Sequence, residues 1–256
     1  MNKTVLITGS TSGIGLGIAT QFAQKGYNVM FNGLEANGAE IATNIATKYR
    51  VKTSFSNANL LDKNQIEALV KETIQTFGSL EVLINNAGIQ HVSPIEAFSS
   101  EKYENIIAIN MNSAFYASKA AWKQMKAQKF GRIINIASVH GLRASEFKVA
   151  YVTAKHGVIG MTKVLALEGA PFNINANAIC PGYVKTPLVE GQIKDQAIAH
   201  QMTEDEVVQK VMLKKQAVKE FVPISVIAET ALLLAGEASA TITGTTFALD
   251  GGWSAQ

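Results

Sequence analysis

The sequence has little of what stabilises small secreted domains, membrane proteins or nucleic-acid binders. Its single cysteine, Cys180, among 256 residues excludes an intrachain disulfide framework and indicates a reducing compartment. No apolar run approaches the roughly 18 residues of a membrane span, and Val5-Leu6-Ile7 is too short for a secretory signal. The net charge of +3 is too mild for a nucleic-acid binder. We therefore expect a cytoplasmic protein that binds neither membrane nor nucleic acid.

Internal repeats, low-complexity runs and Pro/Gly-rich linkers are also missing. The simplest organisation is therefore one domain over residues 1–256, and 47% hydrophobic with 17% charged residues is typical of a globular chain. The histidines show no spacing typical of zinc ligands, so no metal site is expected; they are His91, His140, His156 and His200.

Short apolar runs rich in β-branched residues alternate with amphipathic stretches along most of the chain. The strands predicted from these runs are Thr4–Thr8, Asn28–Asn32, Lys52–Ser56, Val82–Asn85, Arg132–Ser138, Asn175–Cys180 and Thr246–Leu249. The helical patterns between them include Ile14–Lys25, Lys63–Phe77, Ser113–Gln128, Ala150–Leu167 and Ile224–Ala235. Such alternation predicts an α/β fold, a doubly wound, Rossmann-like parallel sheet of about seven strands.

One region breaks the alternation between strand and helix. Residues 186–222 carry two amphipathic segments without a convincing strand, and the second opens with a capping box from Thr203 to Glu206. Because this insertion comes after the sixth strand, it lies at the edge where open α/β sheets bind ligands. We interpret it as a mobile helical lid over the substrate, and its Lys210, Lys214, Lys215 and Lys219 as a solvated helix face.

A glycine-rich turn, Thr8-Gly9-Ser10-Thr11-Ser12-Gly13-Ile14-Gly15, joins the first strand to the first helix. This is the context that a dinucleotide-binding turn requires, because the unpaired amides at the helix start attract phosphate. Gly9 permits the tight turn, Gly13 the approach of the pyrophosphate, and Gly15 close helix–strand packing.

A second set of residues is suited to proton transfer. Tyr151 and Lys155 lie four positions apart in a helical segment and so share one face, and Ser138 ends the preceding strand. A free tyrosine, with a pKa of about 10, is a poor base near neutrality. We expect the ammonium of Lys155 to lower the pKa of Tyr151, and Ser138 to hydrogen-bond the substrate oxygen.

Further polar residues are placed where a substrate would lie. Gln90 comes after an Asn-Asn-Ala-Gly turn, Lys148 precedes Tyr151 by about one helical turn, and Gln192 starts the lid. If the chain stays extended after Ser138, His140 points in the same direction as that serine. Together Gln90, His140, Lys148 and Gln192 offer the donors that match a carboxylate.

These motifs, with Asn85-Asn86-Ala87-Gly88, Pro181-Gly182 and Asp250-Gly251-Gly252 in order along the chain, resemble the short-chain dehydrogenase/reductase family. The resemblance implies that Tyr151 is the general acid/base, that Lys155 also holds the nicotinamide ribose and that Ser138 orients the substrate. It implies that Asn110 positions Lys155 through a water relay. The nucleotide contacts that it implies or the turn predicts are Gly9, Thr11, Ser12, Gly13, Ile14, Gly15, Asn59, Leu60, Asn86, Tyr151, Lys155, Pro181, Gly182, Val184 and Thr186.

The residues just past the second strand predict the preferred nucleotide. Gly33 occupies the usual place of the ribose-binding acid, and we interpret the nearby Glu35 as a surface residue. Thr11 and Leu34 stand where NADP enzymes tend to carry Arg or Lys, so a 2′-phosphate would lack a cation. NAD is therefore the expected cofactor.

The substrate-facing segments resemble those of the bacterial D-3-hydroxybutyrate dehydrogenases within that family. The similarity implies reversible, NAD-dependent oxidation of (R)-3-hydroxybutyrate to acetoacetate, a reaction of ketone body metabolism, by a homotetramer. Tyr183 stands where those enzymes often carry Trp and would wall the methyl pocket, while Trp253 is expected either to close the pocket or to pack at an interface.

Two alternatives remain open. A ketoreductase of a larger 3-oxoacyl or sugar substrate would have an open site and no need for Gln90, His140, Lys148 and Gln192 together. A non-catalytic module that senses NAD would have no need of a tuned phenol such as Tyr151.

Overall fold

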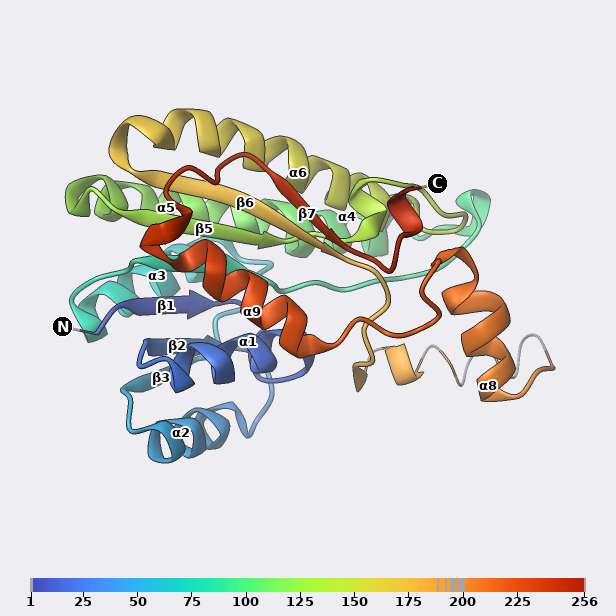
Figure 1. Cartoon of the computed structure of the whole chain (residues 1–256), viewed down its shortest axis with the longest axis horizontal. Helices are drawn as coiled ribbons and strands as arrows, with labels where there is room; N and C mark the ends of the chain where they lie inside the picture. Colours follow the sequence, from blue (N-terminus) through green and yellow to red (C-terminus); the bar gives the residue numbers. More distant parts are fainter. Residues whose placement is uncertain (1, 188, 192, 194–196, 198–200, 256) are drawn as a thin grey trace.

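Seven parallel strands form one sheet, as predicted, and their order is β3-β2-β1-β4-β5-β6-β7 (Figure 1). The computed structural model describes residues 2–187, 189–191, 193, 197 and 201–255. The strands are β1 (Thr4–Ile7), β2 (Asn28–Asn32), β3 (Thr53–Ser56), β4 (Val82–Asn85), β5 (Gly131–Ile136), β6 (Ile174–Pro181) and β7 (Thr246–Leu249). Five of these strands, all except β3 and β7, are buried along their whole length, which explains their largely apolar sequences.

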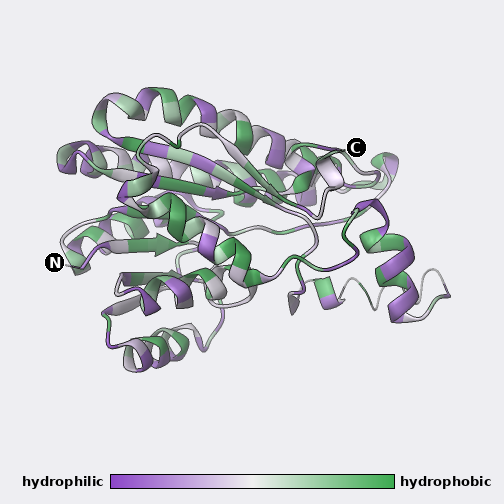
Figure 2. Ribbon diagram, in the orientation of Figure 1, coloured by the Kyte–Doolittle hydropathy of each residue, from purple (hydrophilic) through white to green (hydrophobic). Residues whose placement is uncertain are grey.

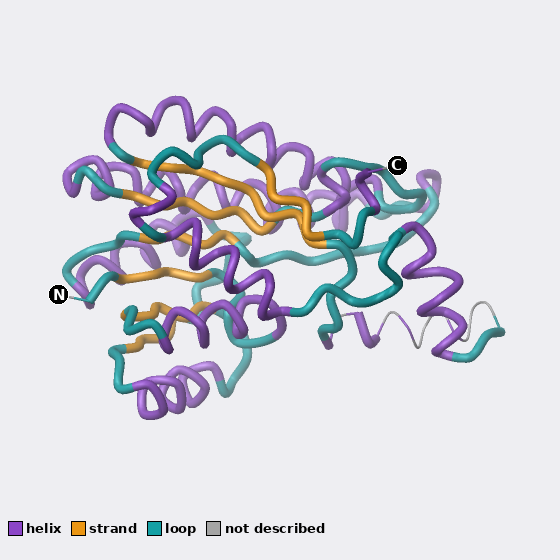
Figure 3. The backbone as a smooth tube through the Cα atoms, viewed as in Figure 1, coloured by secondary structure: helices purple, strands orange, loops and turns teal. Residues whose placement is uncertain are grey.

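Helices cover both faces of the sheet, so the molecule has three layers (Figure 3). The helices are α1 (Gly13–Gln24), α2 (Gly38–Tyr49), α3 (Lys63–Phe77), α4 (Ser100–Ile107), α5 (Ser113–Gln128), α6 (Val149–Gly169), α8 (Glu204–Val207) and α9 (Ile224–Ala235). Helices α1, α2 and α9 share one hydrophobic core with the sheet, and α3, α5 and α6 share the other. The outer helices carry both hydrophobic and hydrophilic residues, as helices with one buried face do (Figure 2).

The strand order reverses between β1 and β4, which are neighbours at the centre of the sheet. Crossovers from β1 lead outward to β2 and β3, whereas β4 begins the run toward β5, β6 and β7. The connections that leave the carboxyl ends of β1 and β4 therefore diverge and open a crevice, the place where doubly wound sheets bind their ligands.

The predicted strand Arg132–Ser138 extends two residues too far. Strand β5 ends at Ile136, and a single 3₁₀ turn, η3 (Val139–Gly141), comes directly after Ser138. The hydroxyl of Ser138 accepts a hydrogen bond from the backbone N–H of His140, which turns the chain away from the extended path.

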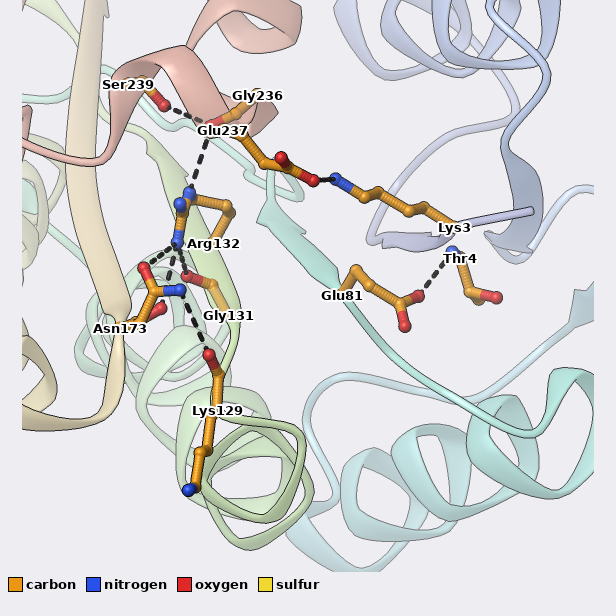
Figure 4. Close-up of polar contacts among 10 residues, drawn as sticks. All are labelled: Lys3, Thr4, Glu81, Lys129, Gly131, Arg132, Asn173, Gly236, Glu237 and Ser239. Carbon is orange, nitrogen blue, oxygen red and sulfur yellow. Dashed lines mark hydrogen bonds and ion pairs between the residues drawn. The ribbon is translucent and has the colours of Figure 1, made fainter. Parts of the chain in front are cut away.

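The edge of the sheet opposite to the crevice is fastened by a buried arginine, Arg132 (Figure 4). Its guanidinium donates hydrogen bonds to the backbone carbonyls of Gly131, Asn173 and Gly236, and so ties β5 to the segments before β6 and after α9. Burial lowers the pKa of Arg132, and the nearby Glu237 opposes that shift. These contacts are structural and lie far from the crevice.

The segment over residues 186–222, interpreted from the sequence as a lid, is described in part. The predicted capping box is confirmed, since Thr203 and Glu206 exchange side-chain to backbone hydrogen bonds at the start of α8. A π-helical turn, η5 (Val208–Met212), and a 3₁₀ turn, η6 (Leu213–Lys215), come after it. In Figure 1 this segment projects beyond the carboxyl ends of the strands, and it has a small hydrophobic cluster of its own around Val207 and Met212. Gln192 lies outside the described residues.

Within the described ranges, no helix is long and apolar enough to cross a bilayer. Across the same part of the chain, His, Cys, Asp and Glu side chains form no cluster suited to holding a metal ion. Cys180 is a buried free thiol at the end of β6.

Candidate active site

Two adjoining cavities occupy the crevice at the carboxyl ends of the strands, and we call them the inner and the outer cavity. The inner cavity is lined by these predicted residues: Ile14, Asn86, Gln90, Ser138, His140, Lys148, Tyr151, Lys155, Pro181, Gly182, Tyr183, Val184 and Thr186. The outer cavity is lined by Gly9, Ser12, Gly13, Ile14, Gly15, Asn59, Leu60, Asn86 and Thr186. Ile14, Asn86 and Thr186 border both cavities, so one long ligand can extend through both.

The turn after β1 has the geometry of a phosphate cradle. Gly9 and Gly13 have φ angles of +59° and +53°, a conformation that glycine adopts freely. A Cβ on Gly15 would lie 2.1 Å from the carbonyl oxygen of Gly9, so helix α1 can approach this closely only with glycine there. The Asn86 amide closes the turn by donating to the carbonyls of Thr8 (3.0 Å) and Gly9 (2.8 Å). The bare N–H groups at the start of α1 therefore face the outer cavity and fit a pyrophosphate.

The end of the outer cavity beside β2 carries a carboxylate. Gly33 leaves free space there, and the Glu35 carboxylate enters it to accept a hydrogen bond from the Thr11 hydroxyl. The described residues that line this cavity include no Lys or Arg. Glu35, interpreted as a surface residue from the sequence, is exposed but borders the cavity, whereas Thr11 lies behind it and does not line it.

Asn59 and Leu60 line the outer cavity beyond β3, as expected for a nucleotide base. The Asn59 side-chain oxygen accepts from the backbone N–H of Leu61 at 3.0 Å, and Gln65 accepts from the Asn59 backbone N–H at 2.9 Å. These bonds shape the turn that leads into α3, so Asn59 contributes through the fixed shape of its loop.

The structure brings Ser138, Tyr151 and Lys155 together at the floor of the inner cavity. The Lys155 ammonium donates to the carbonyl of Ile136 at 2.8 Å and lies 5.5 Å from the centre of the Tyr151 ring. Burial lowers the pKa of Lys155 to about 8. A lysine with a pKa near 8 on one face of a phenol is an arrangement suited to proton transfer near neutral pH.

The expected depression of the Tyr151 pKa by Lys155 is wrong. Burial raises the pKa of Tyr151, and the contact that lowers it is a hydrogen bond with Ser138. Lys155 does not lower the pKa of Tyr151, because its ammonium is held at the Ile136 carbonyl. Ser138 therefore acts on the phenol of Tyr151.

Asn110 lies in a π-helical turn, η2 (Ala108–Asn112), between α4 and α5. Its amide pairs with both backbone groups of Ile89, at 2.8 Å and 2.9 Å. Asn110 therefore holds the loop that carries Gln90 into the inner cavity, without lining that cavity itself. Its relay to Lys155 stays a prediction.

His140 reaches the site by a different route from the one expected. The chain is not extended after Ser138, because η3 turns it, yet Nδ1 of His140 still lies 3.4 Å from the Ser138 hydroxyl. The ring packs edge to face on Tyr151 and Trp253, with centroids 5.9 Å and 5.2 Å apart. Burial, with the charges of Lys148, Lys215 and His156, lowers the pKa of His140 to about 3, so the ring is neutral.

Donors converge on the wall of the cavity opposite to the glycine turn. Lys148 is the N-cap residue of α6, and its ammonium donates to the Tyr183 hydroxyl at 3.4 Å. Burial and the charge of Lys215 lower the pKa of Lys148 to about 8. The Gln90 side-chain nitrogen is buried, and it has no hydrogen-bond partner within the described part of the chain. An acceptor on a ligand would satisfy this amide, as the prediction of a carboxylate requires.

Two further residues lie at or near the inner cavity. Trp253, for which pocket and interface roles were both open, lines the inner cavity and stacks on Tyr183 at 5.9 Å between ring centroids. Lys215, interpreted as part of a solvated face, lies 5.6 Å from the Trp253 ring. Both come from segments distant in sequence from Ser138 and Tyr151, so local spacing carries no signal for them.

Known proteins share both the sequence and the fold. Residues 3–197 match the family model described as short chain dehydrogenase. The chain is 47% identical to a D-beta-hydroxybutyrate dehydrogenase of Rhizobium meliloti, covering 100% of both chains. It is 44% identical to another of Cupriavidus necator, covering 99% of this chain and 98% of the relative. A solved structure of an actinorhodin polyketide ketoreductase with NADPH superposes with a TM-score of 0.93 at 28% identity, covering 100% of this chain and 98% of that one.

Proposed function

The chain belongs to the short-chain dehydrogenase family of oxidoreductases, and on this premise we propose that it oxidises (R)-3-hydroxybutyrate reversibly to acetoacetate, with NAD as hydride acceptor. One observation carries the choice of substrate. Lys148, neutral His140 and the Gln90 amide, which lacks a partner among the described residues, line the same cavity as Tyr151 and Ser138. A short acid with a hydroxyl a few bonds from its carboxylate can reach both groups of donors at once.

The reaction needs one hydride acceptor and one proton acceptor. NAD held by the glycine turn after β1 and by the residues that border both cavities would supply the hydride acceptor for the carbinol carbon. As a phenolate, the form that the hydrogen bond from Ser138 favours, the Tyr151 oxygen takes the hydroxyl proton as the ketone forms, and the resulting phenol returns that proton in the reverse direction. Ser138 hydrogen-bonds the reacting oxygen, while Lys148 and Gln90 hold the carboxylate and so orient the carbinol carbon.

The outer cavity supports NAD over NADP. A 2′-phosphate near Gly33 would meet the Glu35 carboxylate and, among the described lining residues, no cation. An unpaired phosphate beside a carboxylate is unfavourable both by repulsion and by desolvation. A free ribose hydroxyl can instead donate to that carboxylate.

The inner cavity also favours a small acid over a larger 3-oxoacyl or sugar substrate. The stacked rings of Tyr183 and Trp253 and the edge of the His140 ring form a wall on one side. This wall supports the proposal that the Tyr183 ring contacts the methyl group of a four-carbon acid.

A direct assay tests this proposal. The purified enzyme is given (R)- or (S)-3-hydroxybutyrate with NAD or NADP, and the reduced nucleotide is followed by its absorbance. We expect turnover with the (R) acid and NAD, and Tyr151→Phe should lower kcat by roughly a thousandfold while the protein still folds and binds NAD. Turnover of a 3-oxoacyl thioester in preference to acetoacetate would instead support the larger-substrate alternative.

We further propose a homotetramer in the cytoplasm. The α5–α6 face exposes Phe115, Val164 and Leu167, which are 47%, 54% and 79% exposed, and a second copy of the chain would cover these apolar side chains. The buried free thiol of Cys180 fits a reducing compartment.

A further inference from the structure

A row of polar side chains leads from the protein surface to the catalytic serine. The ammonium of Lys215 lies 3.5 Å from the Ser145 hydroxyl, which lies 3.1 Å from Nε2 of His140. On the other side of the ring, Nδ1 of His140 lies 3.4 Å from the Ser138 hydroxyl. Lys215 and Ser145 do not line the inner cavity, so a substrate there would not contact them.

The ammonium of Lys215, at the outer end of this row, can only donate hydrogen bonds. A lysine ammonium has three donors and no acceptor, so the Ser145 oxygen accepts from Lys215. The positive charge also orients the hydroxyl dipole, with its oxygen toward the ammonium and its hydrogen toward His140. Nε2 of His140 is therefore the acceptor of the Ser145 hydrogen.

Because His140 is neutral, a hydrogen bond accepted at Nε2 determines that Nδ1 is a donor. Burial, reinforced by the charges of Lys148, Lys215 and His156, lowers the pKa of His140 to about 3, so the ring carries a single proton. With Nε2 accepting, that proton is on Nδ1 and is donated to the Ser138 oxygen.

Ser138 then has one direction left for its own hydrogen. Its oxygen already accepts from the His140 backbone N–H at 3.1 Å and from Nδ1–H. The hydroxyl hydrogen must therefore point away from His140, toward the Tyr151 oxygen or the reacting oxygen of a substrate. With the opposite tautomer, Ser138 would donate to Nδ1 and lose this capacity.

Lys215 is held in place by a second contact. Its ammonium lies 5.6 Å from the centre of the Trp253 ring, which stacks on Tyr183, and the Tyr183 hydroxyl accepts from Lys148. One exposed side chain therefore touches both the serine–histidine row and the aromatic wall.

We propose that Lys215 is a positioning residue that, through Ser145, holds His140 in its Nδ1–H tautomer and so directs the Ser138 hydroxyl at the reacting oxygen. The proposal rests on the proposed function, since it assigns to Ser138 the hydrogen bond that the oxidation of a hydroxyl requires. The arrangement makes a residue on the lid segment part of the catalytic alignment.

Nitrogen NMR of the enzyme labelled with ¹⁵N-histidine and saturated with NAD tests the tautomer directly. The His140 signals are identified by their loss in His140→Asn. We expect Nδ1 protonated and Nε2 unprotonated in the unmodified enzyme, and a shift toward the Nε2–H tautomer in Lys215→Met and in Ser145→Ala. Lys215→Arg should restore the original pattern, and Lys214→Met, which removes a neighbouring charge on the same turn, should leave it unchanged.

Kinetics supplies the second readout. Lys215→Met should lower kcat roughly fivefold to tenfold, the worth of one well-placed hydrogen bond, with rescue by Lys215→Arg. An Nε2–H tautomer in the unmodified enzyme, or a Lys215→Met variant that keeps Nδ1–H, would overturn the proposal. A change in KM alone, with kcat unchanged, would overturn it too. The NMR result does not depend on substrate identity, so failure of the proposed function is recognised separately by the substrate assay.

Discussion

Lys148 and His140 line the same inner cavity in opposite charge states. Burial lowers the pKa of both groups, to about 8 for Lys148 and to about 3 for His140. Near neutral pH the lysine therefore supplies the charge and the histidine a neutral hydrogen-bonding edge. This division avoids the repulsion between two buried cations, which is the reason that the pKa of His140 is lowered further by Lys148.

The first prediction concerns pH. Butyrate has the carboxylate but no hydroxyl, and it stays ionised over the working range. Because Lys148 binds it only when protonated, butyrate should inhibit most strongly below pH about 8 and lose affinity above it. The inhibition constant against pH measures this. Lys148→Met should weaken inhibition by roughly tenfold to a hundredfold and remove the dependence, whereas a dependence that persists in this variant would contradict the assignment.

The second prediction concerns nucleotide choice. In Leu34→Arg with Glu35→Ala, a cation replaces the carboxylate at the β2 end of the outer cavity. We expect the Kd for NADP, followed by quenching of tryptophan fluorescence, to fall by at least about tenfold, and the Kd for NAD to rise. The single variant Glu35→Gln, which keeps the volume, separates loss of repulsion from gain of the cation. An unchanged ratio of the two Kd values would exclude this end of the cavity as the ribose site.

At the scale of elements, the glycine turn and helix α1 form one unit. Gly15 approaches the backbone of Gly9, while Gly17 of the same helix approaches only the side chain of Ile224 in α9. A Cβ added at Gly15 would lie 2.1 Å from the Gly9 carbonyl oxygen, and this oxygen cannot move without opening the turn. The Ile224 side chain near Gly17 can instead change its rotamer.

The third prediction compares alanine substitutions at Gly15 and at Gly17. Gly15→Ala should abolish measurable NAD binding, because the added Cβ displaces the Gly9 carbonyl and the phosphate-binding amides with it. Gly17→Ala should lower Tm and leave the Kd for NAD within about threefold, since a crowded core contact costs about 1–3 kcal/mol of stability. Thermal unfolding and nucleotide titration of both variants distinguish the two effects. Normal NAD affinity in Gly15→Ala would show that the turn is not the phosphate site.

The elements also show where sequence reasoning succeeds. Strands β2 and β4 were predicted with their observed ends, because buried parallel strands require continuous apolar runs. The same reasoning extended the predicted strand through Ser138, since Ala137 continues the apolar run; in the structure Ala137 is buried but lies beyond the end of β5. The hydrogen bond from the His140 N–H to the Ser138 hydroxyl ends the extended path there. Sequence spacing does not reveal where such a bond from backbone to side chain replaces the strand ladder.

The site was predictable where one element carries several of its residues. Tyr151 and Lys155 share a face of α6 by helical spacing alone. Lys215 and Glu35 were assigned to the surface because their partners, Ser145 and Thr11, are brought to them only by the folding of distant loops. An exposed side chain that borders a cavity has no local signature.

At the scale of the whole molecule, the proposed tetramer requires a surface that a second copy of the chain can cover. A groove between α5 and α6 is lined by the apolar Phe115, Trp122 and Leu165 together with the charged Lys119, Lys123, Lys126 and Glu168, and the exposed Val164 and Leu167 lie next to it. Exposed apolar surface of this kind on two adjacent helices suits a helix-to-helix contact between identical subunits.

The fourth prediction concerns this contact. Val164→Glu with Leu167→Glu should convert a tetramer into a smaller species by light scattering after gel filtration, because carboxylates buried at the contact would repel one another. Lys163→Glu, which changes the charge by the same amount at the neighbouring exposed position, should leave the tetramer intact. A double variant that keeps the mass of the unmodified protein would place the interface elsewhere.

The most direct test of the account is a crystal structure of the enzyme with NAD and acetoacetate. We predict the carboxylate within hydrogen-bond distance of Lys148 and the Gln90 amide, and the ketone oxygen within reach of the Tyr151 and Ser138 hydroxyls. A ligand bound with its ketone oxygen distant from Tyr151, or with its carboxylate away from Lys148, would contradict it.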